Sequence, residues 1–296
     1  MNTVLYNGQL RRLVPRRFAT FSLIIAFTLL TACSSTRMAY RYADWGIVWW
    51  VEDYVTLTGD QKAELNRSIE TFRRWHCSTE LPRYADWLSE LESDIDNLPL
   101  DEQDIAGWQS ELILALDRLL MEVTPIATAL LATLTDEQID ELTRNMAANQ
   151  AETEAEFLDP DPTVSLQRRE QRILERAERW LGSLNNEQKS TVAAFNRARG
   201  SQTAIWLEGR ARWQQALLEV LQERQSERFN SAMVRLIEDN AEVRGERYQA
   251  MVSRSGPALA SLMSDLVAQS KPQQRSHLTS ELANLRQDFD ALSCQG

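Results

Sequence analysis

Glycine, proline, histidine and cysteine are all scarce in this chain of 296 residues, which has ten glycines, eight prolines, two histidines and three cysteines. Few glycines and prolines argue against a β-sandwich, because that fold needs many tight turns. His76 lies beside Cys77, but a metal site needs three or four suitably placed ligands, and His277 is the other histidine. We therefore expect neither a turn-rich β fold nor a metal site.

Common catalytic motifs are absent as well. The sequence has no Cys-x-x-Cys-His haem motif, no His-Glu-x-x-His helix, no Gly-x-Ser-x-Gly elbow and no glycine-rich phosphate loop. Aspartate and glutamate number 43, yet no pair of carboxylates stands out as an acid–base couple. An acidic cluster at residues 152–161 is expected to be a solvated loop, with a weak calcium site as the alternative. We expect no catalytic residue and no cofactor, so the chain is not predicted to be an enzyme.

No hydrophobic run in the sequence is long enough to cross a membrane. The apolar run at residues 18–30 is too short, because a spanning helix needs about 20 residues. Four arginines precede the run and small residues close it, as in a secretory signal. The arginines are Arg11, Arg12, Arg16 and Arg17.

The Leu-Thr-Ala-Cys sequence that ends at Cys33 resembles the lipobox of bacterial lipoproteins. The resemblance implies that residues 1–32 are a cleaved signal peptide and that the Cys33 thiol carries diacylglycerol. Ser34 follows, where an aspartate would suggest retention in the inner membrane, so the resemblance implies the periplasmic face of the outer membrane. Soluble secretion and an uncleaved anchor are the alternatives.

Net charge bears on the partners of the cleaved chain. Removing residues 1–32 takes away four of 32 basic side chains and none of 43 acidic ones, so the formal net charge changes from −11 to −15. Such a chain is poorly suited to nucleic acids, whose binding depends on lysine and arginine. Anionic lipid head groups repel it too, and several acyl chains are needed for stable anchoring. We therefore expect membrane contact through the lipid on Cys33, and no nucleic-acid partner.

Two cysteines remain beyond Cys33. Cys77 and Cys294 can pair in an oxidising periplasm, and that bridge would tie the first helical hairpin to the last helix. The alternative is two separate thiols, because spacing along a sequence does not establish geometry.

Helical periodicity dominates residues 40–292, and no alternating strand pattern of any length is present. Apolar side chains recur at the i, i+3, i+4, i+7 spacing of an amphipathic helix. The two clearest stripes consist of Ile105, Trp108, Leu112, Ala115, Leu116, Leu119 and Val123, and of Ile205, Trp206, Trp213, Ala216, Leu217, Val220 and Leu221. The sequence predicts an all-α fold, built as a multi-helix bundle or as stacked helical hairpins.

Proline and glycine mark the expected ends of helices. The Asp-Pro-Asp-Pro sequence at residues 159–162 is the strongest break, because proline disfavours helical backbone at the residue before it. We use it to separate two helical halves that can still pack as one bundle. The expected segments are a signal peptide (1–32), a lipidated N-terminus with a short tether (33–39), a first helical half (40–158), a Pro-rich turn (159–163) and a second helical half (164–296). Further breaks are expected at residues 97–99, near Thr133, near Gly182, at residues 255–257 and at residues 270–272.

Three predicted helix starts share a leucine, a capping residue and a glutamine three positions after the cap. In such a capping box the cap side chain accepts from the third amide, and the glutamine side chain accepts from the amide of the cap. The three are Leu57, Thr58 and Gln61; Leu134, Thr135 and Gln138; and Leu184, Asn185 and Gln188, with Ser270 and Gln273 as a looser fourth. Four well-capped helices are the favoured interpretation, and a degenerate helical-hairpin repeat is the alternative.

An aromatic segment at residues 40–50 lies only a few residues beyond Cys33. On a helix Trp45 and Trp49 share a face, and Tyr42 lies one turn earlier. Because amphipathic aromatic side chains are enriched at membrane interfaces, contact with the membrane or with a partner is one interpretation. Packing of these side chains against the helical core is the favoured one.

The stretch beyond Cys33 carries a series of short aromatic and acidic motifs. They include Met38-Ala39-Tyr40, Asp44-Trp45, Trp49-Trp50, Asp53-Tyr54-Val55, Trp75-His76 and Glu80-Leu81-Pro82-Arg83-Tyr84. In these motifs the chain resembles a proteobacterial lipoprotein family of unknown function, catalogued as domain of unknown function 6279. The resemblance is densest over residues 30–90 and implies a lipoprotein with an all-helical fold. That family has no established activity, so the resemblance implies no site residues.

A second resemblance concerns the Leu-Thr-x-x-Gln sequences at residues 57–61 and 134–138, which are similar to a motif of Spy- and CpxP-type periplasmic chaperones. Our expectation for the whole chain is a lipid-anchored envelope protein, a non-catalytic scaffold or adaptor that binds a protein partner. A periplasmic holdase-type chaperone is the alternative, and a cell-wall hydrolase is a less favoured one.

Overall fold

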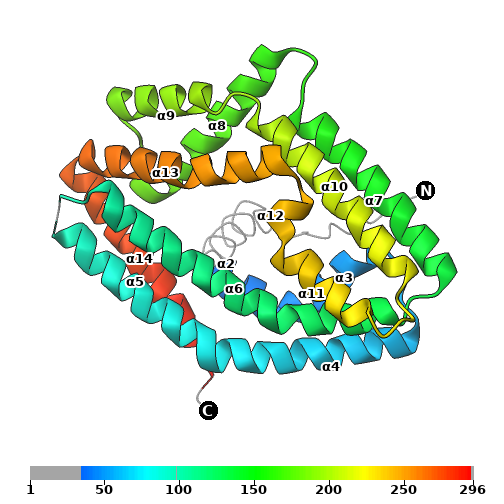
Figure 1. Cartoon of the computed structure of the whole chain (residues 1–296). Coiled ribbons are helices and arrows are strands. Elements are labelled where there is room, and N and C mark those ends of the chain that lie inside the picture. The colour runs from blue at the N-terminus through cyan, green and yellow to red at the C-terminus, as the bar shows by residue number, and fades with distance from the viewer. Residues whose placement is uncertain (1–34, 98, 295–296) are drawn as a thin grey trace, which may run out of the picture. The chain divides into compact units, whose positions relative to one another are not determined.

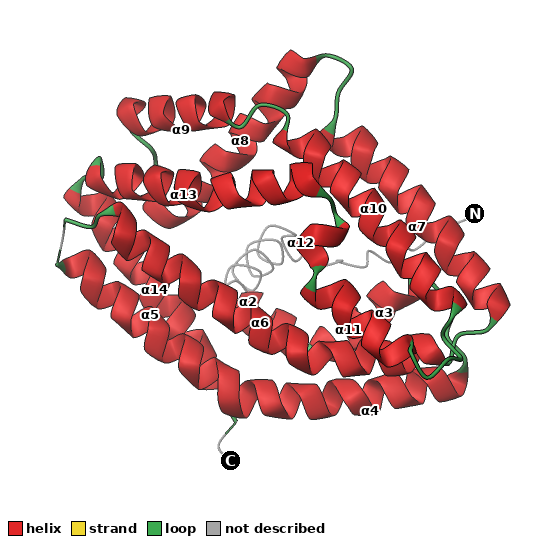
Figure 2. Cartoon of the chain, viewed as in Figure 1, coloured by secondary structure: helices red, strands yellow, loops and turns green. Residues whose placement is uncertain are grey.

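The structure, a computed structural model, describes residues 35–97 and 99–294. Within these ranges every regular element is a helix and no strand occurs, which confirms the predicted all-α fold (Figure 2). The chain divides into two units, Met1–Arg41 and Tyr42–Gly296, and each is described by itself. None of the described helices is long and apolar enough to cross a membrane.

Figure 1 colours the helices in chain order, from blue to red. The first unit contains α2 (Ser35–Arg41), and the other described helices belong to the second unit. Those of the second unit are α3 (Ala43–Glu52), α4 (Gly59–Trp75), the π-helical turn η1 (His76–Glu80), α5 (Leu81–Asp96), α6 (Glu102–Ala132), α7 (Asp136–Phe157), α8 (Pro162–Leu181), α9 (Asn186–Ala198), α10 (Gln202–Gln222), α11 (Phe229–Glu238), α12 (Asn240–Val243), α13 (Glu246–Ala268) and α14 (Pro272–Leu292).

Helices from before and after the proline turn pack against one another in the second unit. α5 lies along α14, α6 contacts α11 and α13, and α7 lies along α10 (Figure 1). The largest apolar core likewise joins Leu65 of α4 and Met146 of α7 to Leu221 of α10. The two sequence halves therefore share their cores.

The three predicted capping boxes form at the starts of α4, α7 and α9. The first two also bond to each other: Gln61 Nε2 donates to Gln138 Oε1 at 3.1 Å, and Gln138 Nε2 donates to Gln61 Oε1 at 2.8 Å. Each amide reaches the other's preceding loop as well, Gln61 donating to the Thr133 carbonyl (3.0 Å) and Gln138 to the Thr56 carbonyl (2.8 Å). The starts of α4 and α7 are thus held together by their own caps.

The fourth helix start lies one residue later than predicted. Pro272 is the first residue of α14, so the cap position falls on Lys271, whose N–H donates to Gln274 Oε1 at 3.0 Å. The predicted cap, Ser270, instead donates its hydroxyl to a carbonyl at the end of α13. Gln274 Nε2 then donates to Gln188 Oε1 at 2.9 Å, which pairs the starts of α14 and α9 as the starts of α4 and α7 are paired.

The predicted breaks separate helices with one exception. Gly182 ends α8 with a φ of 69°, a left-handed conformation that glycine adopts easily because it lacks a Cβ. The break predicted at residues 255–257 is wrong, because α13 runs through Pro257 without interruption. α13 packs against α6, α9 and α10, and that packing outweighs the one backbone hydrogen bond that proline cannot make.

The two predicted apolar stripes differ in burial. Of the stripe at residues 205–221, the part at residues 213–221 packs into the largest core along α10, whereas the Trp206 ring contacts Phe157 of α7. The stripe on α6 is only partly covered: Ile105 is fully buried, but Leu112, Leu116 and Val123 are exposed. α6 carries apolar residues on more than one face, and its neighbours cover only some of them.

Candidate functional site

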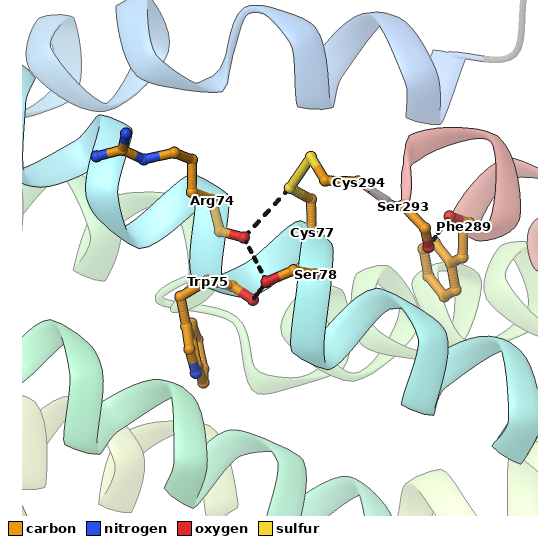
Figure 3. Close-up of a disulfide and its surroundings, with 7 residues drawn as sticks. All are labelled: Arg74, Trp75, Cys77, Ser78, Phe289, Ser293 and Cys294. Carbon is orange, nitrogen blue, oxygen red and sulfur yellow. Dashed lines mark hydrogen bonds between the residues drawn. A yellow bond between two sulfur atoms is a disulfide. The ribbon is translucent and has the colours of Figure 1, made fainter. Parts of the chain in front are cut away.

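A disulfide joins Cys77, in η1, to Cys294, just beyond α14 (Figure 3). The two Cα atoms are 5.1 Å apart, and the Cys294 N–H donates to the Cys77 carbonyl oxygen at 3.0 Å. The bridge ties the start of α5 to the end of α14, and an ion pair between Arg286 and Glu92 (2.9 Å) joins the same two helices. α5 and α14 therefore form a firmly held pair.

A buried carboxylate lies on the same π-helical turn. Both oxygens of the fully buried Glu80 accept from Arg118 Nε, at 3.1 and 3.0 Å, and Arg83 donates to one of them at 2.9 Å. Burial, reinforced by the negative charge of Glu80, raises the pKa of Tyr84 to about 12. Burial also lowers the pKa of His76, against the opposing effect of Glu80. The ion pair between Glu80 and Arg118 joins η1 to α6, and the arginines offset the buried negative charge of Glu80.

Metal-ligating side chains do not gather in residues 35–97 and 99–294, where no group of three or more His, Cys, Asp or Glu is placed to hold an ion. Cys77 belongs to the disulfide, and the His76 ring stacks on Phe72 with centroids 5.8 Å apart. In the acidic cluster before α8, Asp159 forms an ion pair with Arg168 at 3.4 Å.

The predicted lipidation site, Cys33, lies outside the described residues. Of the aromatic segment, Tyr42, Trp45 and Trp49 are 64%, 69% and 58% exposed, so the expectation that they pack into the core is wrong. α3 contacts α4, and Val48 is the residue of α3 that is buried. The Trp45 and Trp49 rings stack with centroids 6.3 Å apart and form an exposed aromatic face near the start of the second unit.

A groove of about 800 Å³ runs between α6 and α11. We call it the α6–α11 groove; its exposed apolar lining includes Leu120 and Met121 of α6 and Val234 of α11, while Thr124 and Thr128 are buried within it. Asp117 and Glu238 add exposed carboxylates to the lining. On α6 the groove lies next to Leu112 and Leu116, the exposed residues of the apolar stripe that come before Leu120. Exposed apolar side chains therefore extend along α6 beyond the groove.

A cavity of about 670 Å³ lies between α5, α6, α8, α9, α13 and α14. Every described residue that lines it is either apolar or an arginine. The aromatic lining residues are Trp87, Trp108, Trp180 and Phe195, and the arginines are Arg169, Arg172, Arg176 and Arg199. We call it the arginine cavity. Its volume lies within the range of about 300–1,000 Å³ that is usual for small-molecule sites.

These features define an all-helical protein with an apolar cavity that carries arginines, and with an exposed groove on another face. The chain belongs to a family described as "Family of unknown function (DUF6279)", whose model matches residues 53–249. The match therefore begins after the motifs between Cys33 and Glu52. A search of the curated proteins and a search of the solved structures each found no match.

The arginine cavity was not predicted from the sequence. One signal for it is present, because Arg169, Arg172 and Arg176 recur at the i, i+3, i+7 spacing that places them on one face of a helix in a strongly acidic chain. The contribution of Arg199 from another helix, and the apolar walls from α5, α13 and α14, depend on tertiary packing and leave no local pattern.

Proposed function

We propose that this chain is a lipid-anchored, non-catalytic adaptor of the cell envelope that binds a protein partner in the α6–α11 groove. The observation that carries the proposal is the groove itself, which exposes Leu120, Met121 and Val234 and carries the carboxylates of Asp117 and Glu238. Recognition of a helix in a groove needs an apolar cleft and no catalytic group. The partner segment is an amphipathic helix with an apolar face and basic flanks.

The sequence supports attachment to the periplasmic face of the outer membrane through a lipid on Cys33. The exposed face of Tyr42, Trp45 and Trp49 follows Cys33 by only a few residues, and aromatic side chains of this kind suit a membrane interface. In this arrangement the lipid holds the adaptor at the membrane and the aromatic face orients it.

The test places a photo-crosslinking amino acid at Leu120, which lines the groove, in living cells. Adducts are purified and identified by mass spectrometry. One or two discrete partners that crosslink at Leu120 are expected. The matched position is Gln171, exposed on α8, where the same partners should not crosslink.

One variant separates groove binding from non-specific binding. Met121→Glu adds a third carboxylate to the lining of the groove and should abolish the adducts without unfolding the protein, because Met121 is 67% exposed. A broad range of unfolded envelope proteins, increasing under heat stress, would instead favour the holdase hypothesis. That hypothesis began from the Leu-Thr-x-x-Gln sequences, whose leucines and glutamines are buried in the helix-start pairs.

A further inference from the structure

The lining of the arginine cavity is unusual for this chain. Acidic side chains outnumber basic ones by 43 to 32 in the sequence, yet none of the described residues that line the cavity is acidic. Four arginines and otherwise only apolar residues form its walls. A cavity of this kind combines apolar walls with a local concentration of positive charge.

One of the four arginines has a structural explanation. Arg169 donates to the Asn196 side chain (2.6 Å) and to the carbonyls of Asn196 (2.8 Å) and Gly200 (3.0 Å) at the end of α9. A cation at the C-terminus of a helix is favourable because the free carbonyls there carry partial negative charge. All of these acceptors are formally neutral, so the positive charge of Arg169 is solvated but not cancelled.

The remaining three arginines have no such explanation. Among the described residues, no carboxylate forms an ion pair with Arg172, Arg176 or Arg199. The guanidinium of Arg172 lies over the Phe157 ring at 4.8 Å, and that of Arg199 lies over Phe195 at 5.4 Å. These aromatic faces contact the two guanidinium groups without cancelling their charge.

Two buried donors at the cavity lack partners. Arg199 Nε and Trp87 Nε1 are buried and form no hydrogen bond in the described part of the chain. Buried donors without an acceptor are rare in folded proteins, because they lose their bonds to water. Burial also lowers the pKa of Arg199, and burial together with the charges of Arg199 and Arg172 lowers that of Arg169. An anion bound beside Arg199 would accept from its Nε–H and reduce the repulsion between like charges.

We propose that the arginine cavity binds a single-chain anionic amphiphile. Its alkyl chain occupies the volume between Trp108, Trp180 and the aliphatic side chains of α13 and α14, and its carboxylate or phosphate head is held by Arg172, Arg176 and Arg199. A small inorganic anion would leave the apolar walls uncovered, and a neutral lipid would leave the arginines without a counter-charge. This site is independent of the α6–α11 groove and of the adaptor proposal.

The test uses the full chain in nanodiscs of phosphatidylcholine, titrated with brominated undecanoate, whose bromine quenches tryptophan on contact. Saturable quenching is expected, and Trp180→Phe should reduce its amplitude. Brominated undecyl phosphate is the second anionic probe. The probe that binds more tightly indicates whether the natural ligand is a fatty acid or derives from a phospholipid. Brominated undecanol and inorganic phosphate should bind at least tenfold more weakly, because each supplies only half of the recognised chemistry.

Matched variants on α8 distinguish binding by the cavity arginines from an effect of net charge alone. Arg176→Gln removes an exposed lining arginine and should weaken undecanoate binding roughly fivefold, whereas Arg179→Gln, on the same helix but outside the lining, should leave it unchanged. Ala177→Phe keeps every charge and should abolish binding by filling the cavity. Circular dichroism of each variant verifies that the helices remain.

Either of two results would overturn the proposal. One is equal quenching by undecanoate and undecanol in the wild type, which would mean partition into the nanodisc. The other is an equal effect of Arg176→Gln and Arg179→Gln in well-folded protein, which would mean that net charge alone governs binding.

Discussion

Single glutamines hold helix starts together in pairs. Gln188 is fully buried; its side-chain oxygen accepts from the Asn185 N–H (3.0 Å), while its Nε2 donates to the Leu266 carbonyl (2.9 Å). Gln274 performs the same two tasks for its own cap and for the Ser183 carbonyl (3.0 Å). Each amide thus satisfies backbone groups of two chain segments at once, and few other side chains have the donors and the acceptor to do so.

The position of Gln274 at the start of α14 gives a prediction about stability. Gln274→Ala should lower the free energy of unfolding by about 1–3 kcal/mol, because buried partners lose their hydrogen bonds. Gln273→Ala, one residue earlier and exposed, should change it by less than about 0.5 kcal/mol. Urea unfolding followed by circular dichroism measures both. Equal effects would mean that the helix-start pair contributes nothing to stability.

The spacing of residues along the sequence predicts three of these helix caps, but it does not predict which helix starts bond to each other. A capping box lies within four residues, so the sequence alone reveals it at Thr58, Thr135 and Asn185. The bond between Gln61 and Gln138 joins positions 77 residues apart and depends on how helices pack. The one-residue error at the fourth start has a local cause, since proline prefers the first helical position and Pro272 therefore places the cap at Lys271.

Tyr84 gives a prediction at alkaline pH. Its pKa is raised to about 12 from 10.0, so the folded state favours the neutral phenol. The resulting stabilisation is present below about pH 10 and is lost as the pH rises from about 10 towards 12. Spectrophotometric titration of the folded protein should show one late phenolate step, absent in Tyr84→Phe and retained in Tyr42→Phe. A titration that is the same in all three proteins would contradict this assignment.

At the scale of whole helices, the sequence predicts where most helices begin and end but not which of their faces is buried. Caps, prolines and Gly182 are local signals. α3 and α6 are apolar on several sides, and neighbouring helices cover only one part of each. The exposed positions of Trp45 and of Leu116 therefore follow from packing that the periodicity does not specify.

The disulfide gives the prediction at the scale of the α5–α14 pair. It closes a loop of 217 residues, so reduction should lower the stability by up to about 5 kcal/mol on the chain-entropy estimate. Guanidinium unfolding with and without dithiothreitol measures this change. Reduction should also change the gel mobility of the wild type, whereas Cys294→Ser should respond to dithiothreitol in neither assay. Identical midpoints for oxidised and reduced wild type would count against a stabilising bridge.

At the scale of the whole molecule, charge acts differently over long and short distances. The net charge of −11 repels anionic surfaces, but its effect is screened beyond about 8 Å at physiological salt. Along the arginine cavity four guanidinium groups lie on an apolar wall with no carboxylate among the described lining residues, and their attraction for an anion is stronger there than in open solvent. An acidic protein can therefore avoid anionic membranes and still bind a single anionic lipid chain.

The adaptor proposal leaves membrane attachment to the lipid on Cys33, because the same charge balance disfavours anionic surfaces. An acidic chain with no described membrane-spanning helix gains little from contact with anionic head groups, so we expect Cys33→Ala to move the protein from the membrane pellet to the soluble fraction or to leave its signal uncleaved. Cell fractionation and intact mass measure the two outcomes. The wild type should carry the mass of the acyl groups at Cys33.

A Trp45→Ser, Trp49→Ser double variant is the matched control for that experiment. It removes the exposed aromatic face and leaves Cys33 in place, so it should stay in the pellet with its acyl mass unchanged. If the aromatic face were the anchor, the double variant would be released and Cys33→Ala would be retained. Because the two hypotheses predict opposite fractions for the two variants, one fractionation decides whether a lipid or a protein surface holds this chain at the membrane.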